Sequence, residues 1–201
     1  MNSTVLTLIQ ELEELGRDHD AKEFEHSRKF LNLERSTAEL IRILILCSQR
    51  KRVLEIGTSN GLSAIYLAST LREIRNASPL VTIERDTSKA AAAKQNFERA
   101  DLTDFIDLRI GSATDIIKEL TGPFDCIFFD ADRFSALEQL YLLLPKLSKD
   151  ALLLTDNVRS HPQELAQYMG AFDGMPEFTT SVIAIGKGLH IAYRSQISGE
   201  S

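Results

Sequence analysis

Several features are scarce in this sequence of 201 residues. It contains two cysteines, Cys47 and Cys126, which are too few for the disulfide framework of a small secreted protein. Both lie in apolar stretches, so we expect two buried thiols. The 10 glycines and 5 prolines form no linker or low-complexity tract, and no apolar stretch approaches the roughly 20 residues of a membrane span. We therefore expect one domain, residues 1–201, with no membrane segment.

Positive charge is also in short supply. The chain has 23 Lys and Arg residues against 29 Asp and Glu residues, which gives a formal net charge of −6 at pH 7. Such a chain has no general attraction to phosphate backbones, and the sequence contains no obvious basic patch. This balance disfavours a nucleic-acid partner. The first residues contain no apolar signal-like segment, so we expect a cytoplasmic protein.

The N-terminal segment is charged and helical in pattern. We predict two helices within residues 5–30. Ser36 and Glu39 have the spacing of a capping box, which predicts that an amphipathic helix begins there. Residues 1–35 are accordingly expected to form a helical cap or an oligomerisation segment beside a cofactor-binding core formed by residues 36–201.

Strand patterns and helical patterns alternate along the rest of the chain. The predicted strands are 52–57, 80–84, 105–110, 124–130 and 151–156, and the predicted helices between them are 62–74, 87–100, 112–120 and 136–147. Strands joined by helices run parallel, with helices on both faces of the sheet. Two more strands within residues 178–194 surround Gly186, Lys187 and Gly188, a turn that closes an antiparallel hairpin. The order predicts an α/β fold with a Rossmann-like, seven-stranded, mostly parallel sheet.

The segment VLEIGTSNGL, residues 53–62, is the first candidate ligand site, because ligands of open α/β sheets bind beyond the carboxyl ends of the strands. Gly57 and Gly61 leave the backbone bare for a ligand, and Ser63 can hydrogen bond to it. Dinucleotides are usually bound by G-x-G-x-x-G, which this segment lacks. Glu55 would repel a phosphate and suits an ammonium group. The pattern therefore favours S-adenosylmethionine over a nicotinamide cofactor.

Two further strand ends carry candidate cofactor contacts. Glu84 ends the second predicted strand, where this type of fold places an acid that binds both ribose hydroxyls. A carboxylate in water is the alternative interpretation of Glu84. Ser112 and Ala113 follow the third predicted strand and are small enough to flank an adenine ring.

Five segments resemble the caffeoyl-CoA and catechol O-methyltransferase family: RVLEIGTSNGLSAIYLA, VTIERDTSKAAAAKQNFERA, GPFDCIFFDADR, LLLTDNV and IAIGKGL. The resemblance begins at about Leu31 and implies a bacterial-type, S-adenosylmethionine-dependent O-methyltransferase that acts on hydroxylated aromatic compounds and forms a homodimer. The expected cofactor-binding residues are Leu33, Glu55, Gly57, Ser59, Gly61, Ser63, Glu84, Arg85, Ser112, Ala113, Asp130 and Asp132.

The resemblance also implies a divalent metal site. In this family the first Asp of a D-A-D-K segment and a later Asp-Asn pair bind the metal, and they correspond here to Asp130, Asp156 and Asn157. All three follow predicted parallel strands, and two carboxylates with an amide oxygen suit Mg²⁺ or another hard cation. The alternative is that Asp130 contacts only the cofactor and that the Asp-Asn pair merely ends a strand.

One position departs from the family pattern. The D-A-D-K segment ends in a lysine that can act as a base, whereas the corresponding residue here is Arg133, whose guanidinium stays protonated. Arg133 can orient an anionic substrate, pair with Asp132 or lie on the surface. His161 is the other candidate base, although a histidine at a helix start also suits a backbone hydrogen bond. The expected catalytic residues are Asp130, Arg133 and His161.

The reaction expected from these residues is methyl transfer to a hydroxyl group of a small aromatic acceptor, assisted by a divalent metal. Three alternatives stay open at this point. They are a metal-independent methyltransferase, a tRNA hydroxyuridine methyltransferase, and an S-adenosylmethionine-binding protein without catalytic activity.

Overall fold

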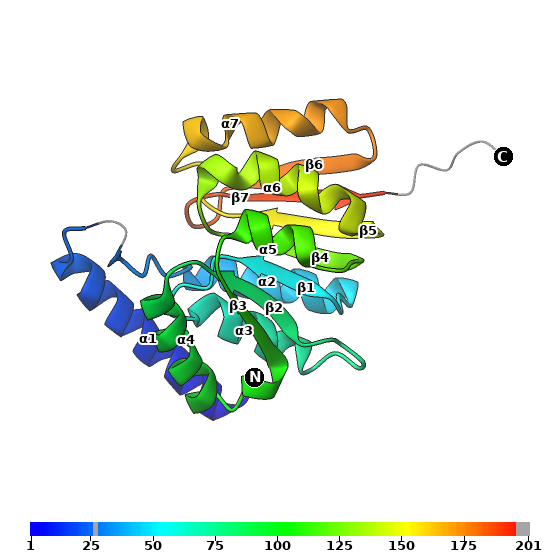
Figure 1. Ribbon diagram of the computed structural model, residues 1–201. Helices are drawn as coiled ribbons and strands as arrows, with labels where there is room; N and C mark the ends of the chain where they lie inside the picture. The colour runs from blue at the N-terminus through cyan, green and yellow to red at the C-terminus, as the bar shows by residue number, and fades with distance from the viewer. Residues whose placement is uncertain (26–27, 196–201) are drawn as a thin grey trace.

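A seven-stranded sheet forms the centre of the protein. The computed structural model describes residues 1–25 and 28–195. The strands lie in the order β3-β2-β1-β4-β5-β7-β6 (Figure 1). They are β1 (Val53–Ile56), β2 (Leu80–Glu84), β3 (Ile106–Ile110), β4 (Phe124–Phe129), β5 (Leu147–Thr155), β6 (Phe178–Ile183) and β7 (Leu189–Arg194). Strands β1 to β5 run parallel, and β7 is antiparallel to both β5 and β6. The predicted mostly parallel sheet with a C-terminal hairpin is confirmed.

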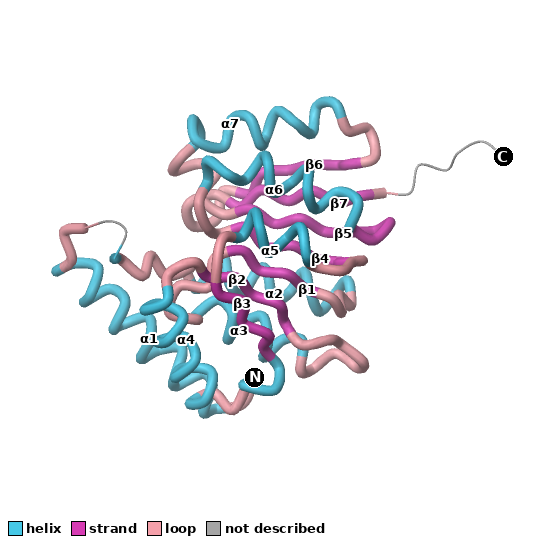
Figure 2. The backbone as a smooth tube through the Cα atoms, viewed as in Figure 1, coloured by secondary structure: helices cyan, strands magenta, loops and turns pink. Residues whose placement is uncertain are grey.

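Helices cover both faces of this sheet. They are α1 (Ser3–Lys22), α2 (Arg35–Ser48), α3 (Leu62–Leu71), α4 (Thr87–Arg99), α5 (Ala113–Glu119), α6 (Ala136–Leu143) and α7 (Pro162–Ala171). Helices α1 to α4 contribute to one hydrophobic cluster, and α5 to α7 contribute to another. Figure 2 shows the strands running through the middle of the molecule with helices on both sides. Among the described residues, every helix is too short or too polar to cross a lipid bilayer.

The two hydrophobic clusters meet the sheet through alternating residues. Successive side chains of a strand point to opposite faces. Val53 accordingly packs with α1 to α4, while Leu54 packs with α5 to α7, and Cys126 and Ile127 of β4 alternate in the same way. Because both faces are covered, every residue of β1 is buried. This is why the central strands are nearly continuous apolar runs in the sequence.

Among the described residues, the N-terminal segment contains one α-helix where we predicted two. Helix α1 ends at Lys22, and residues 23–25 and 28–34 form no α-helix; residues 26 and 27 of the predicted second helix lie outside the described residues. The carboxylate of Asp20 accepts hydrogen bonds from the backbone N–H groups of Phe30 and Leu31, at 2.8 and 2.9 Å. These long-range bonds fix the loop against the end of α1. Figure 1 shows α1 lying alongside α4.

Two local predictions on α2 are wrong. The helix begins at Arg35 with no side-chain hydrogen bond at its N-cap, so the capping box predicted for Ser36 and Glu39 does not form. Those residues lie inside the helix, because the residue before Arg35 already has the extended backbone of an N-cap. Cys47 is exposed rather than buried, on the same outward stripe as the exposed Ile43 one turn earlier. Cys126 is buried, as predicted.

The boundary between α6 and β5 also differs from the prediction. Helix α6 ends at Leu143, four residues before the predicted end, and β5 begins at Leu147 instead of residue 151. Pro145 lies between them in a short 3₁₀ turn. Proline lacks a backbone N–H, so Pro145 cannot donate the hydrogen bond that would continue the α-helix.

A buried histidine lies on β7. His190 is 1% exposed and contacts the aromatic rings of Tyr168 and Phe172, with centroid distances of 5.9 and 5.1 Å. Its Nδ1 atom has no hydrogen-bond partner among the described residues. Burial lowers the pKa of His190 to about 4. The side chain is therefore neutral in the folded protein at neutral pH.

We predict that the fold loses stability as His190 becomes protonated. The unfolded chain takes up this proton near the ordinary pKa of 6.5, whereas the folded chain does so only near 4. The contribution of neutral His190 to the free energy of unfolding is thus fully present above pH 6.5. It declines as the pH falls toward 4, by at most about 1.4 kcal/mol per pH unit. Urea unfolding across this range should show a shallower decline in a His190→Phe variant. Equal slopes in the two proteins would contradict the assignment.

Candidate active site

The carboxyl ends of β1, β4 and β5 form one row along an edge of the sheet. Strand β1 pairs with β2 on one side and with β4 on the other, so the strand order reverses there. The backbone N–H groups of Gly57, Asp130 and Asp156 each continue the ladder one residue beyond a strand end, donating to the neighbouring strand at 3.0, 2.9 and 3.1 Å. These bonds hold three of the predicted site residues side by side.

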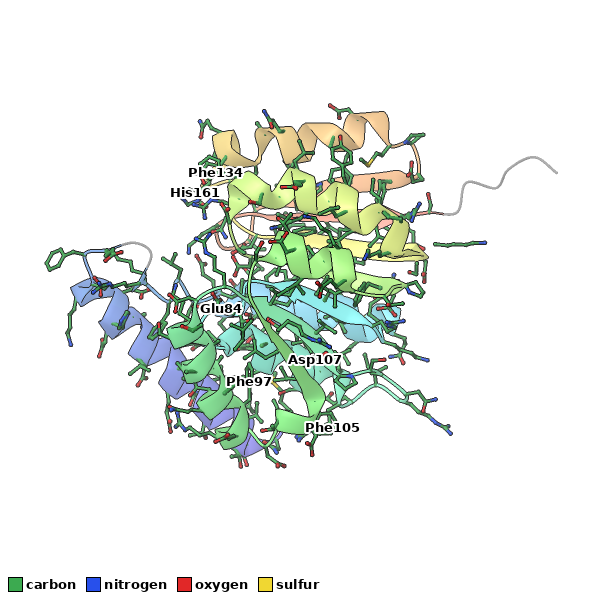
Figure 3. All side chains as sticks on the ribbon, in the orientation of Figure 1. Glu84, Phe97, Phe105, Asp107, Phe134 and His161 are labelled. Carbon is green, nitrogen blue, oxygen red and sulfur yellow. The ribbon has the colours of Figure 1, made fainter. Side chains whose placement is uncertain are left out.

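A cavity of about 530 Å³ opens at this edge. Its volume is within the range of small-molecule sites, about 300–1,000 Å³. Most of the predicted residues line it: Leu33, Gly57, Ser59, Ser63, Glu84, Arg85, Ser112, Ala113, Asp130, Asp132, Arg133, Asn157 and His161. Figure 3 shows Glu84, Phe134 and His161 at the same end of the strands. The fold therefore brings together residues that are as far apart in the sequence as Leu33 and His161.

Gly57 allows the turn after β1 to pass directly against the end of β4. Its φ angle is +101°, a left-handed conformation that L side chains rarely adopt. A Cβ atom at this position would lie 2.3 Å from the carbonyl oxygen of Asp130. Both constraints require glycine, and they leave the turn without a side chain where the cavity begins.

Glu84 is held in place by the backbone. One carboxylate oxygen accepts a hydrogen bond from the Ser59 N–H at 2.7 Å, and the other accepts one from the Asp86 N–H at 2.8 Å. The side chain is 8% exposed and lines the cavity. Each carboxylate oxygen can accept more than one hydrogen bond, so both retain capacity for a ligand. A pair of neighbouring hydroxyl groups, such as those of a ribose, fits this arrangement.

Glu55 lies beneath the cavity rather than in its wall. It is 0% exposed, and its Oε2 atom accepts a hydrogen bond of 2.6 Å from the Thr82 hydroxyl. The Thr82 proton is used in that bond, so the Thr58 hydroxyl, 2.6 Å away, must donate to Thr82. Burial raises the pKa of Glu55 to about 7, against the effect of this hydrogen bond. Gly61 also lies outside the wall, against the ring of Phe97.

The partly exposed Asp130 and the buried Asp156 form an acid pair. Burial, then the charges of Asp156 and Glu55, raise the pKa of Asp130, and burial raises the pKa of Asp156. The Asn157 side chain donates a hydrogen bond of 2.9 Å to Asp130. Asp156 Oδ1 is buried without a hydrogen-bond partner in the described part of the chain. Asp156 borders a small separate cleft shared with Asp130 and Asn157, not the main cavity.

This donor set fits a hard cation. Two carboxylates and an amide supply the oxygen ligands that Mg²⁺ and Ca²⁺ prefer, and the unpaired Asp156 Oδ1 is one oxygen available to a cation. Residues 1–25 and 28–195 contain no group of three or more His, Cys, Asp or Glu side chains that could hold a metal ion. An amide oxygen from Asn157 would have to complete the set.

Arg133 pairs with Glu164 rather than with Asp132. Its Nε atom donates to the Glu164 carboxylate at 2.5 Å, and Glu164 comes from the first turn of α7. Asp132 instead accepts hydrogen bonds from the Phe134 N–H and the Ser135 hydroxyl, at 3.2 and 3.0 Å. The Arg133 charge is therefore largely balanced within the cavity wall.

His161 occupies the start of α7. Its backbone N–H donates to the Asn157 carbonyl at 3.0 Å, and its Nδ1 atom lies 2.9 Å from the Ser160 hydroxyl. The predicted helix-start position is confirmed. The ring also lines the cavity, so a role as a base remains a prediction.

The sequence pattern did not identify several residues of the cavity wall. They include Phe30, Phe134, Gln139, Glu164 and Lys187. Lys187 was predicted only as part of a turn. The others lie in a loop or on helices, where no local spacing distinguishes a cavity residue from a surface residue.

We predict that Gly57→Ala destabilises the protein by about 2 kcal/mol or more, through the left-handed backbone and the contact with Asp130. Gly170→Ala is the matched control, because Gly170 lies within α7 with nothing within 4 Å of its added Cβ. That change should stabilise the protein by roughly 0.5–1 kcal/mol. Thermal unfolding measures both. Similar melting temperatures for the two variants would show that the turn is not constrained as described.

Comparison with known proteins places this chain in a family. A family model described as O-methyltransferase matches residues 6–194, and the chain belongs to that family. The catechol O-methyltransferase of Niastella koreensis is 34% identical over 132 residues, covering 64% of this chain and 58% of that protein. The catechol O-methyltransferase of Mycobacterium tuberculosis is 36% identical over 114 residues, covering 55% of this chain and 49% of that protein. The matches thus span about half the length of these relatives.

Solved structures show the same fold. A putative caffeoyl-CoA O-methyltransferase from Staphylococcus aureus has a TM-score of 0.75 and 25% identity, covering 93% of this chain and 99% of that chain. The O-methyltransferase TomG from Streptomyces achromogenes, solved in complex with S-adenosylmethionine, has a TM-score of 0.80 and 24% identity, covering 97% of this chain and 91% of that chain. The predicted family resemblance and the Rossmann-like fold are confirmed.

Proposed function

We propose that the protein is an S-adenosylmethionine-dependent O-methyltransferase that methylates a hydroxyl group of a small aromatic acceptor. The observation that carries this proposal is the Glu84 carboxylate, fixed by two backbone N–H groups at the wall of a cavity that begins at the bare Gly57 turn. A nucleoside whose ribose hydroxyls bind Glu84 would have its other end near Asp130. The TomG complex, which is similar in fold, contains this cofactor.

The opposite end of the cavity suits an aromatic acceptor. Phe134 lines it and is 78% exposed, so its ring is available to pack against a planar ligand. The S-adenosylmethionine sulfonium supplies the methyl group. The wall residues bind and orient the acceptor, and excluding water there strengthens their electrostatic interactions. His161 is the candidate base, because Arg133 is protonated and paired with Glu164.

A divalent cation is part of the proposal. Asp130, Asp156 and Asn157 would hold it, and when bound it would lower the pKa of the acceptor hydroxyl as a Lewis acid. The burial of Asp156 and its unpaired Oδ1 atom support this assignment.

Several other expectations stay predictions. These are the homodimer, the cytoplasmic location, the small-molecule rather than nucleic-acid partner, and the role of residues 1–35 as a cap or oligomerisation segment beside the 36–201 core. The acidic net charge of −6 remains the argument against a tRNA substrate.

Cofactor binding is tested by titrating the protein calorimetrically with S-adenosylhomocysteine. We expect Glu84→Gln to weaken binding by about tenfold to a hundredfold, because charge-assisted hydrogen bonds each contribute about 1.5–3 kcal/mol. Glu98→Gln, an exposed change on α4, is the control with the same loss of charge and should bind normally. Failure of the folded native protein to bind, or normal binding by Glu84→Gln, would refute the proposed cofactor site.

The metal assignment is tested by Mn²⁺ binding to the S-adenosylhomocysteine complex, followed by the electron paramagnetic resonance signal of free Mn²⁺. We expect binding to the native protein and a loss of at least about tenfold in affinity in Asp156→Asn, because one of two charged ligands is removed. Asp150→Asn, an exposed change at the opposite end of β5, is the control. Equal affinities in the native and Asp156→Asn proteins would favour the metal-independent alternative.

A further inference from the structure

The segment that leads into α2 forms part of the cavity wall. We call residues 29–33 the strap. Four of its residues line the cavity: Phe30, Leu31, Asn32 and Leu33. The strap contains no α-helix or strand, so no regular backbone hydrogen bonding holds it in place. Its position therefore depends on hydrogen bonds from other elements.

Asp20 holds the strap from the side of α1. One of its carboxylate oxygens accepts a hydrogen bond from the Phe30 N–H at 2.8 Å, and the other accepts one from the Leu31 N–H at 2.9 Å. The His19 ring stacks on the Phe30 ring with a centroid distance of 4.3 Å. Leu31 has a φ angle of +51°, a left-handed conformation that residues other than glycine rarely adopt. The two bonds thus hold the strap in a shape that its backbone does not favour by itself.

Helix α1 does not explain the placement of Asp20. This residue lies in the last turn of a helix that ends at Lys22, where the partial negative charge of the helix dipole repels a carboxylate. Besides the neighbouring His19 ring, its hydrogen-bond partners among the described residues are the two strap N–H groups. The bonds to the strap therefore offset an unfavourable position in the helix.

Residues of the candidate cofactor site hold the strap from the other side. The Ser59 hydroxyl donates to the Phe30 carbonyl at 2.7 Å, while the Ser59 N–H donates to the Glu84 carboxylate at 2.7 Å. The Lys89 ammonium donates to the Lys29 carbonyl at 2.7 Å. Ser59 thus connects the strap to the carboxylate proposed to bind the ribose. A movement of the strap would disturb that end of the cavity.

We propose that Asp20 is a positioning residue for the cofactor: through Phe30 and Leu31 it keeps the strap in the cavity wall at the nucleoside end and slows the release of bound S-adenosylmethionine. The inference rests on the proposed function and deepens it, because it assigns control of cofactor exchange to a residue on α1. Asp20 does not line the cavity, so it acts through the strap and not by touching the ligand.

The test measures the release of radiolabelled S-adenosylmethionine after a chase with excess S-adenosylhomocysteine. Asp20→Asn should release the label at least about tenfold faster than the native protein, because an amide offers one oxygen acceptor instead of two and removes the charge from both bonds. Asp18→Asn is the matched control, since it removes the same charge from an exposed position on α1. It should release the label as the native protein does.

A second measurement uses the native protein and does not depend on the folding of a variant. Amide hydrogen exchange of Phe30 and Leu31 reports the opening of the strap, because these N–H groups are bonded to Asp20. Saturating S-adenosylhomocysteine should slow their exchange by about tenfold or more, since a bound ligand stabilises the wall that it contacts.

The outcomes separate this inference from the proposed function. Faster release by Asp20→Asn alone, together with slower exchange of the two strap amides in the complex, supports the inference. A native release rate in Asp20→Asn, the same acceleration in Asp18→Asn, or exchange of the strap amides that the ligand leaves unchanged would each overturn it while ligand binding is retained. A folded native protein that binds neither ligand would instead remove the proposed cofactor site itself.

Discussion

The site depends on one constraint. The hydrogen-bond ladder between the parallel strands continues one residue beyond the strand ends. Gly57, Asp130 and Asp156 each follow a strand, and each still donates its N–H group to the neighbouring strand. The geometry of the sheet thus sets the spacing between the bare turn and the two carboxylates. The same geometry leaves no space for a Cβ on Gly57. The row itself is formed by backbone hydrogen bonds and not by side-chain contacts.

The buried acids give the site its electrostatic character. Glu55 and Asp156 are nearly inaccessible and Asp130 is only partly exposed, and burying carboxylates near one another is costly unless a positive charge compensates them. A sulfonium cofactor and a divalent ion are the cations proposed for this place. A bound cation would offset part of the cost of burying these carboxylates.

The sequence predicted the parts of the fold that follow from local patterns. Buried parallel strands are recognisable as apolar runs, and the position of Glu84 at the ligand edge could be predicted because the acid that ends the second strand has a defined place in this fold. Glu55 was correctly placed in β1, but its position below the cavity depends on how the turn packs over it. Lys187 and Glu164 could not be found, because a hairpin turn and a helix reach the cavity only through tertiary packing.

The local predictions that were wrong also failed because tertiary packing decides those positions. Cys47 lies in an apolar stretch, yet α2 turns it outward, since the core needs only one face of that helix. The loop after α1 has a helical pattern but is held by Asp20 through contacts distant in the sequence. Local propensity is a weak guide where long-range hydrogen bonds compete with it.

The most direct measurement of the central claim is a crystal structure of the S-adenosylhomocysteine complex. The account predicts ribose hydroxyls within hydrogen-bond distance of the Glu84 carboxylate and the sulfur beside Asp130. Density for the ligand elsewhere, or a Glu84 carboxylate directed away from the sugar, would contradict it.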